Sequence, residues 1–424
     1  MLDRTDTTYK IDWRIINWLR GLAAFYVVVN HSRGFLFTDT ASYSANVNPQ
    51  SNWAFWEWLQ VRIMQFTNLG SEFVVFFFLL SGFSIAHSLR SNNDTKEFYK
   101  RRLLRLYPTY VLGIVWAIIA FVIISIFASP VFYAGVEGQE PLLRYYHYFI
   151  DLKALLLNLI YIPTDNYLTH QYWSLPHEVI FYLLAPWVIK KYRWMGIVAL
   201  SWYLIGWAFS GISQNEPDSS PIFLQFTSDY AIYFFIGILF YRYKDRLISS
   251  FRLNKTATIV LGIVLFMSVS LMKGYVFHQV QNKVTGLGIT LLAYVLLFGA
   301  MKNNIRIKPL ERIGEYSYTL YVTHIATIFV LKTITYKMGY GFHLIDNMLI
   351  WYFGIFFSVF MAWGLYRVAE QPSTAYVSKM RLRKKNTDGK SVNSIEDAIH
   401  TGFSGKQPST ANMDPFSGEN GKLP

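Results

Sequence analysis

Long apolar segments recur along this chain of 424 residues, and they constrain its fold more than any other feature. Most segments run for about 17–23 residues, which lets a helix cross the roughly 30 Å hydrocarbon core of a membrane. Only 15% of the residues are charged and 53% are hydrophobic, a balance unlike that of a soluble protein. We therefore expect an all-α polytopic membrane protein. The pattern predicts about ten transmembrane helices, at residues 15–37, 67–89, 104–128, 176–190, 195–212, 226–242, 256–272, 284–301, 313–333 and 347–366.

The loops between these segments predict how the chain is oriented. Most lysines and arginines fall in alternate loops, and cytoplasmic loops carry such an excess. The asymmetry holds if the apolar stretch 148–162, which contains Asp151 and Lys153, is a short re-entrant or interfacial helix rather than a crossing. We expect residues 1–14 and the polar, disordered tail 376–424 to be cytoplasmic. No cleaved signal is predicted, and the expected location is a cell membrane, such as a bacterial inner membrane.

Charge and cysteine content exclude several function classes. The formal charge of +13 suggests nucleic-acid binding, but the basic residues alternate with the apolar segments as membrane topology requires, so we expect no nucleic acid as a partner. The chain has no cysteine, which excludes a disulfide, a thiolate nucleophile and a cysteine-ligated metal. We predict no metal site and no tightly bound cofactor. The predicted outer loop 38–66 carries Trp53, Trp56 and Trp58, which would anchor at the membrane interface or stack on sugars.

Two ionisable residues interrupt the first apolar segment. Arg20 and His31 are eleven residues apart, about three helical turns, so both lie on one face of the predicted helix and about 16 Å apart along its axis. An arginine inside hydrocarbon costs roughly 2.5–3.5 kcal/mol, and such residues usually serve a function. The alternative is that Arg20 extends to the inner interface while His31 sits near the outer one.

A second polar group opens the fourth predicted helix, at Pro176-His177-Glu178. That helix enters from the outer side, so the sequence predicts Glu178 in the same outer layer as His31. A histidine beside a carboxylate suits general base catalysis, in which the carboxylate fixes the histidine tautomer or holds the acceptor. The alternative is that Glu178 only stabilises the N-terminus of its helix.

Four cations mark the inner end of the third predicted helix: Lys100, Arg101, Arg102 and Arg105. Arg102 and Arg105 are three residues apart and share a helical face. Guanidinium groups bind phosphates through paired hydrogen bonds, so we predict that this cluster recognises a phosphorylated donor. Orientation of the helix and binding of anionic lipid head groups are the alternatives.

These residues, in this order, resemble the acyltransferase-3 family of integral membrane O-acyltransferases, over about residues 11–375. Any one motif is weak, but six in family order argue against coincidence. The motifs are Arg20 and His31 as the Arg-x10-His signature, Phe76 through Ser81-Gly82-Phe83, Arg102-x-x-Arg105 before Tyr107-Pro108, Trp173-Ser174-Leu175-x-x-Glu178, Gly314 through Ser317-Tyr318 and Tyr321 to His324, and Glu370-Gln371-Pro372.

The resemblance implies transfer of an acyl group, usually acetyl, from acyl-CoA as co-substrate to a hydroxyl of a carbohydrate or glycolipid acceptor. Residues 15–375 would form the transmembrane acyltransferase domain. His31 would act as general base or carry the acyl group itself, and Glu178 would orient His31 or the acceptor. The residues implied in donor binding are Arg20, Arg101, Arg102 and Arg105. The residues implied on the acceptor side or in support are Trp173, Ser174, Ser81, Gly82, Tyr318 and His324.

Several alternatives stay open. Ser81-Gly82 serves equally as a small-residue contact between helices, and His324 as a structural hydrogen-bonding group. Bacterial surface polysaccharides, lipid-linked glycans and small metabolites all fit as acceptors, and longer acyl chains fit as donors. A proton-coupled transporter or flippase would use the same intramembrane Arg20, His31 and Glu178, although the chain has no repeat symmetry of the kind that transporters show.

Overall fold

The computed structural model describes residues 9–37, 43–45, 48–91, 94–131, 152–163, 167–210, 223, 226–275, 278–340 and 348–380. Every regular element in these ranges is a helix, which confirms the all-α prediction. The chain divides into two compact units, Met1–Thr374 and Ala375–Pro424. The helices of the first unit are α1 (Trp13–Leu36), η1 (Gln50–Asn52), α3 (Phe55–Gln65), α4 (Gly70–Ser91), α5 (Thr95–Phe127), α7 (Leu152–Leu159), η4 (Tyr167–Ser174), α8 (Leu175–Lys190), α9 (Tyr192–Ser210), η6 (Phe226–Tyr230), α11 (Ala231–Arg242), α12 (Lys244–Ser250), α13 (Lys255–Tyr275), α14 (His278–Asn303), α15 (Lys308–Glu315), α16 (Ser317–Lys337) and α17 (Met348–Tyr366).

Each of the ten predicted segments contains a helix, and the boundaries differ most at two places. α5 begins at Thr95, nine residues before the predicted start, because the Asp94 side chain accepts hydrogen bonds from backbone N–H groups of its first turn. The segment predicted as 313–333 is divided at Tyr316, where α15 ends and α16 begins. α7 lies within the predicted short helix 148–162. The first four residues of that stretch, and the tail beyond residue 380, lie outside the described ranges.

Five of the described helices combine the length and the apolar composition needed to cross a membrane. α1 and α16 are not among them, and both contain strongly polar residues, Arg20, Asn30 and His31 in α1 and His324 and Lys332 in α16. The five helices support a multi-pass membrane protein, whereas the count of ten crossings and the location of both termini stay predictions. The five are Gly70–Arg90, Thr95–Phe127, Lys255–Lys273, Lys283–Asn303 and Leu349–Tyr366.

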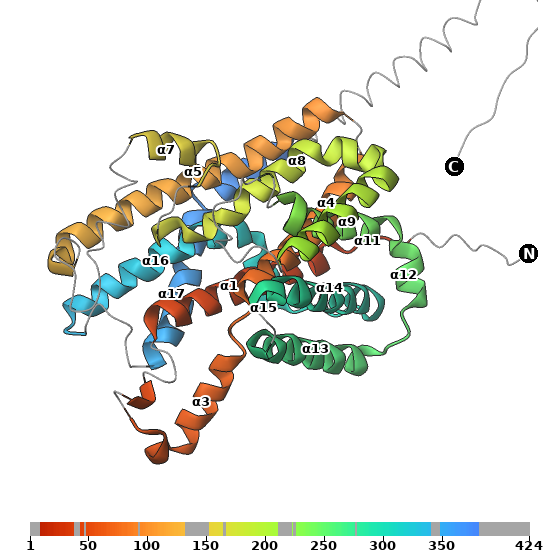
Figure 1. The fold of residues 1–424 in the computed structure, drawn as a ribbon. Helices are drawn as coiled ribbons and strands as arrows, with labels where there is room; N and C mark the ends of the chain where they lie inside the picture. Colours follow the sequence, from red (N-terminus) through yellow and green to blue (C-terminus); the bar gives the residue numbers. More distant parts are fainter. Residues whose placement is uncertain are drawn as a thin grey trace, which may run out of the picture. The chain divides into compact units, whose positions relative to one another are not determined.

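α16 lies at the centre of the first unit. Its residues 317–333 are all buried, and it packs against α1, α5, α17 and η4 (Figure 1). A helix that is covered on every side holds its polar residues in fixed positions. The positions so fixed include Tyr318, Tyr321 and His324 of the late motif.

Two pairs of glycines allow unusually close contact between helices. A Cβ atom on Gly82 of α4 would lie 2.1 Å from a backbone oxygen of α11, and one on Gly237 of α11 would lie 2.1 Å from a backbone oxygen of α4. Gly21 of α1 and Gly314 of α15 show the same reciprocal relation at 1.9 Å. No side chain fits at these distances, so both contacts require glycine. Gly82 therefore lies in a close packing contact between α4 and α11.

The predicted outer loop 38–66 contains a helix that the sequence analysis did not predict, α3. The three tryptophans of this region differ in exposure. Trp53 is buried, Trp58 is half-buried with the Arg62 guanidinium 5.5 Å from its ring centroid, and Trp56 is 66% exposed. Only Trp56 of the three presents an open face for anchoring at an interface or for stacking on a sugar.

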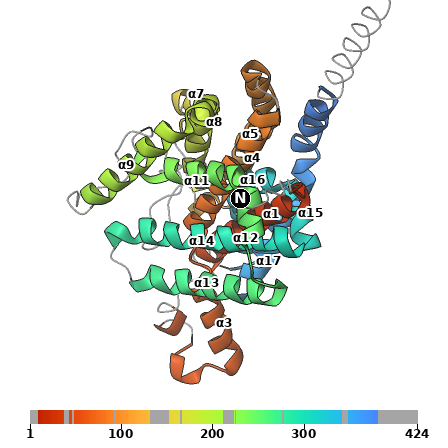
Figure 2. The ribbon, with the colours of Figure 1, turned by 90° about the vertical axis from the view of Figure 1, so that its right-hand side faces the viewer.

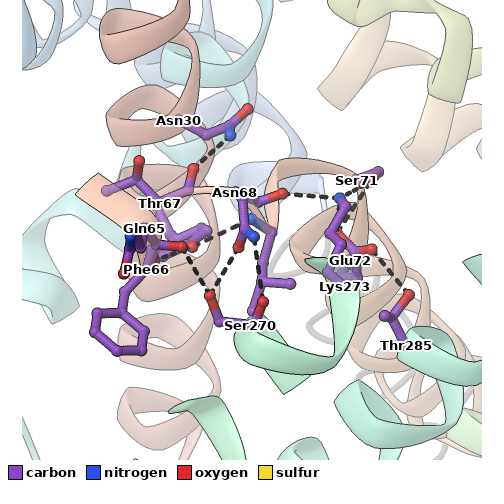
Figure 3. A network of polar contacts seen from close by, with 12 residues as sticks. Asn30, Gln65, Phe66, Thr67, Asn68, Ser71, Glu72, Ser270, Lys273 and Thr285 are labelled. Carbon is purple, nitrogen blue, oxygen red and sulfur yellow. Dashed lines mark hydrogen bonds and ion pairs between the residues drawn. The ribbon is translucent and has the colours of Figure 1, made fainter. Parts of the chain in front are cut away.

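A network of polar contacts fixes α4 against the neighbouring helices α13 and α14 (Figure 3), which lie side by side (Figure 2). Glu72 of α4 is only 2% exposed, forms an ion pair with Lys273 at 2.8 Å and accepts a hydrogen bond from Thr285 at 2.9 Å. Asn30, directly before His31, donates to a backbone carbonyl of the turn that precedes α4. These contacts hold the His31 end of α1 in place against α4.

Candidate active site

A pair of histidines joins α1 to α16. His31 Nδ1 lies 2.8 Å from His324 Nε2. The ring planes differ by only 16° and the ring centroids are 5.1 Å apart, so the two rings meet edge to edge in nearly one plane. His324 is fully buried and His31 is half-buried. We refer to His31, His324 and their surroundings as the histidine end of the site.

A third histidine comes within electrostatic range of His31. It is His170 of η4, and its side chain is exposed. Two other side chains of η4 hold this segment on α16, because Gln171 Nε2 and Tyr172 Oη donate to the carbonyl oxygen of Val322 at 3.1 and 3.0 Å. The sequence analysis missed His170, whose only signal was its place just before the Trp-Ser-Leu motif.

Trp173 and Ser174, both predicted on the acceptor side, end η4. Ser174 is buried, and its Oγ lies 2.6 Å from Tyr321 Oη, so this side chain joins η4 to α16. Trp173 is half-buried, with its ring 5.6 Å from that of Tyr230 and 6.1 Å from that of His177. Of the two residues, Trp173 is therefore the one with surface available to a ligand.

Three arginines converge near the other end of α1. Arg20 and Arg105 both lie within electrostatic range of Arg102, whose guanidinium is 5.5 Å from the ring centroid of Tyr182. Neither Arg20 nor Arg102 forms a hydrogen bond or an ion pair with another residue in the described part of the chain. Like charges held together in this way repel one another and favour an anion among them. We refer to this group as the arginine end of the site.

Arg101, also predicted to bind the donor, pairs elsewhere. Its buried guanidinium lies 3.9 Å from the carboxylate of Glu97, one turn earlier in α5. Arg101 also lies four residues before Arg105, so helical spacing alone does not set it apart from the other arginines, and its distinguishing feature is the pairing with Glu97. The structure therefore brings together three of the four predicted donor-binding arginines.

Glu178 lies at the arginine end, so the prediction that it shares a layer with His31 is wrong. Its Oε1 atom accepts a hydrogen bond from Ser81 Oγ at 3.4 Å. α1 and α4 run antiparallel, with Asn30 against Gly70, and Ser81 follows Gly70 by eleven residues, about 16 Å along α4. The prediction failed because it placed the start of α8 at the membrane surface, whereas η4 precedes α8 and packs along α16.

Phenolic side chains surround Glu178. Tyr182 Oη donates to its carboxylate, and Tyr161 and Tyr318 lie within electrostatic range of it and are hydrogen-bonded to each other. Tyr318, predicted on the acceptor side, is thus at the arginine end. Tyr161, which the sequence analysis missed, has a φ angle of 63° and stacks on Tyr110 at 4.1 Å between centroids. Such a backbone conformation is uncommon outside glycine and tends to occur at functional sites.

Ser81 and Gly82 face different neighbours. Ser81 Oγ lies 3.4 Å both from Glu178 Oε1 and from Tyr182 Oη, while Gly82 packs against α11. Ser81 therefore bonds to groups at the arginine end, whereas Gly82 has a packing role, and neither contact tests a role on the acceptor side.

Glu370, from the last motif, accepts hydrogen bonds at the N-terminus of α16. Its Oε2 atom accepts hydrogen bonds from Thr319 N at 2.9 Å and Thr319 Oγ1 at 2.6 Å, where a carboxylate also interacts favourably with the helix dipole. Burial raises the pKa of the Glu370 carboxyl, and the hydrogen bonds from Thr319 and the nearby Arg105 and Arg20 act in the opposite direction. This carboxylate thus lies at the edge of the arginine end.

The site as a whole is a set of polar groups at two levels of a bundle of apolar helices. Within the described ranges, no group of three or more His, Asp or Glu side chains could hold a metal ion. Such a site is typical of a membrane-embedded protein that acts on a polar ligand.

Comparison with known proteins defines the family. The model of an acyltransferase domain family matches residues 13–367, and the chain belongs to this acyltransferase-3 family. Over 149 residues it is 32% identical to a protein named acyltransferase MdmB from Streptomyces mycarofaciens, a match that covers 34% of this chain and 35% of that protein. Over 151 residues it is 28% identical to an uncharacterized protein from Haemophilus influenzae, covering 34% and 60% respectively. The chain therefore spans about a third to 60% of the length of these curated relatives. No solved structure matches it.

Proposed function

We propose that this protein is a membrane O-acyltransferase. It moves an acyl group, with acetyl as the first candidate, from acyl-CoA at the arginine end to a hydroxyl of a carbohydrate or glycolipid at the histidine end. The observation that carries the proposal is the separation of the two ends along one helix. Arg20 and His31 are eleven residues apart in α1, which corresponds to about 16 Å.

The arginine end suits a phosphorylated donor. Arg20 and Arg102 form no hydrogen bond or ion pair among the described residues, and Arg105 lies near Arg102, so Arg20 and Arg102 offer several N–H donors to phosphate oxygens. An acyl-CoA carries its phosphates and its thioester at opposite ends of an extended pantetheine arm. With the phosphates held at the arginine end, that arm is long enough to bring the thioester close to His31.

His31 supplies the base for the transfer. Its free ring nitrogen takes the proton of the acceptor hydroxyl while the hydroxyl oxygen bonds to the thioester carbonyl carbon. The carbon–sulfur bond then breaks, and the proton passes from His31 to the departing thiolate. The products are the acylated acceptor and CoA with a free thiol. A positioned histidine contributes about 10²–10⁴ in rate to such a step.

η4 offers groups that suit a carbohydrate acceptor. The exposed His170 lies within electrostatic range of His31, and the half-buried Trp173 follows in the same element. An aromatic face can stack on a sugar ring while an imidazole bonds to hydroxyl groups. These residues support an acceptor that approaches His31 from the side of η4.

Labelled acetyl-CoA tests this function in membranes that contain the wild type, His31→Ala or His87→Gln, together with a panel of carbohydrate acceptors. His87 is a matched control, because it lies in α4 against Trp13 and Tyr241, outside the site. We expect equal labelling in the wild type and in His87→Gln, and a loss of about 100-fold or more in His31→Ala at equal abundance.

Two results would contradict the proposal. Undiminished labelling in His31→Ala would exclude His31 as the base. Absence of labelled product from the wild type across the whole panel would favour transport of a polar solute over acyl transfer.

A further inference from the structure

One ring nitrogen ties His324 to its own helix. His324 Nδ1 lies 2.8 Å from the carbonyl oxygen of Tyr321 and 3.1 Å from that of Leu320. Carbonyl oxygens only accept hydrogen bonds, so Nδ1 carries a proton. The ring is fully buried and pairs with no carboxylate among the residues that the structure describes, so a second proton would leave a buried charge uncompensated. His324 is therefore neutral, with its lone pair on Nε2.

That lone pair decides which nitrogen of His31 carries the proton. The distance of 2.8 Å between His31 Nδ1 and His324 Nε2 is that of a hydrogen bond. Because His324 Nε2 accepts, His31 Nδ1 must donate. The neutral His31 ring then has its own lone pair on Nε2, the nitrogen that points away from His324. Free histidine in water favours the opposite tautomer, so this arrangement depends on the partner.

We propose that His324 is a positioning residue that holds His31 in the tautomer protonated on Nδ1, with Nε2 free to act as the base. The proposal rests on the acyl transfer proposed above and adds which nitrogen reacts and what selects it. The shared plane of the rings fixes the direction of the lone pair as well as the tautomer. The burial of 317–333 gives His324 the rigidity that this role needs.

The partner is unusual in being neutral, since a carboxylate more often holds a catalytic histidine. In the transfer step, Nε2 of His31 takes the hydroxyl proton as the carbon–oxygen bond forms, and gives it to sulfur as the carbon–sulfur bond breaks. The Nδ1 proton remains hydrogen-bonded to His324 throughout. A neutral acceptor orients the His31 imidazolium without a compensating charge, which favours rapid return of the proton to the leaving thiolate.

Two substitutions separate positioning from mere packing. His324→Leu removes the acceptor, whereas His324→Gln places an amide oxygen within reach of His31 Nδ1. In the full chain in lipid nanodiscs, with acetyl-CoA and a working acceptor, we expect kcat to fall about 100-fold in His324→Leu and no more than about tenfold in His324→Gln. The KM for acetyl-CoA should stay within about twofold of the wild type in both variants, because the donor is held elsewhere. Equal loss in both variants, or a matching rise in KM, would overturn the proposal.

The ¹⁵N NMR spectrum of histidine-labelled protein gives a readout that does not depend on turnover. The His31 signals are identified by their loss in His31→Ala. We expect the wild type to carry the His31 proton on Nδ1 and His324→Leu to shift it toward Nε2. A wild-type proton on Nε2 would overturn the proposal. If the proton is on Nδ1 but the wild type transfers no acyl group, the assignment of the tautomer stands and the proposed function fails instead.

Discussion

The two ends of the site differ in how their polar groups are satisfied. At the histidine end, His324 has partners on both ring nitrogens, His31 has one on Nδ1, and Asn30 is bonded to the turn before α4. At the arginine end, Arg20 and Arg102 have no hydrogen bond or ion pair within the described part of the chain. One end is therefore preorganised by the protein alone, and the other presents positive charge to a substrate.

This difference suits the proposed roles of the two ends, which are acyl transfer at the histidine end and substrate binding at the arginine end. A reacting group needs a fixed direction, which the hydrogen bonds of the histidine end provide. A group that binds a charged, flexible substrate needs N–H donors that the protein has not already paired, and the nearby carboxylates of Glu178 and Glu370 leave Arg20 and Arg102 without an ion pair among the described residues. Glu178 bonds to Ser81 and Tyr182, and Glu370 bonds to Thr319, and within the described residues neither carboxylate forms an ion pair with Arg20 or Arg102.

The largest expected effect is a loss of folded protein in Gly82→Val, because both ends of the site depend on the contact between α4 and α11. Gly82→Val would place its Cβ 2.1 Å from the backbone of α11, so its cost should exceed the roughly 1–3 kcal/mol of ordinary overpacking. We expect little folded protein on size-exclusion chromatography in detergent. Gly34→Ala is the control, because a Cβ there meets nothing within 4 Å. A folded, active Gly82→Val protein would show that α4 and α11 are not in close contact.

A smaller effect, about 3 kcal/mol of stability, is expected from Lys273→Met. The substitution removes the cation that pairs with the buried carboxylate of Glu72, so the temperature of unfolding should fall. The affinity for acetyl-CoA should not change, because this network fixes the histidine end. Lys255→Met, at the exposed start of the same helix, is the control. If the affinity for acetyl-CoA falls together with stability, the Glu72 network also supports the arginine end, and the two ends are not independent.

Arg102→Gln should cost about 2 kcal/mol of donor binding, which corresponds to a rise of about 30-fold in the KM for acetyl-CoA. The value of kcat at saturation should change little. Arg246→Gln, an exposed arginine on α12, is the matched control. Arg101→Gln should have a smaller effect on KM, since Arg101 pairs with Glu97. Equal effects at positions 101 and 102 would show that net charge, and not the lack of an ion pair at Arg102, determines binding.

The smallest effect is expected from Tyr182→Phe, about 1 kcal/mol or roughly fivefold in KM. Without the phenol, the carboxylate of Glu178 is free to turn toward Arg102 and compete with the donor phosphates. Tyr99→Phe is the control, because Tyr99 donates only to a backbone carbonyl, that of Leu183, on the outside of α8. An unchanged KM in Tyr182→Phe would mean that this hydrogen bond does not keep Glu178 away from Arg102.

Sequence patterns were sufficient to predict those features of the structure that depend on residues close together in the chain. Each of the ten predicted apolar segments contains a helix, and helical periodicity places Arg102 and Arg105 on one face. The small residue Gly82 signals a close contact between helices before the partner is known. Each of these features depends on residues within a few turns of one another.

Contacts between distant segments could not be predicted in the same way. The partner of His31 lies 293 residues away, and nothing local distinguishes His324 from a merely structural histidine. The position of Glu178 along the site depends on η4, the segment before α8. The backbone of η4 is irregular at Thr169, and no apolar periodicity in the sequence predicts this segment. The same element brings His170 toward His31, which is why that residue was also missed.

If donor binding and base catalysis occupy separate ends of one site, a change at His31 should leave donor binding intact. Isothermal titration calorimetry of acetyl-CoA with purified His31→Gln protein measures this. We predict a Kd within about twofold of the wild type in a protein that no longer transfers the acyl group, because the arginine end is unchanged. A loss of binding comparable with that of Arg102→Gln would contradict the account, since His31 would then belong to the donor site.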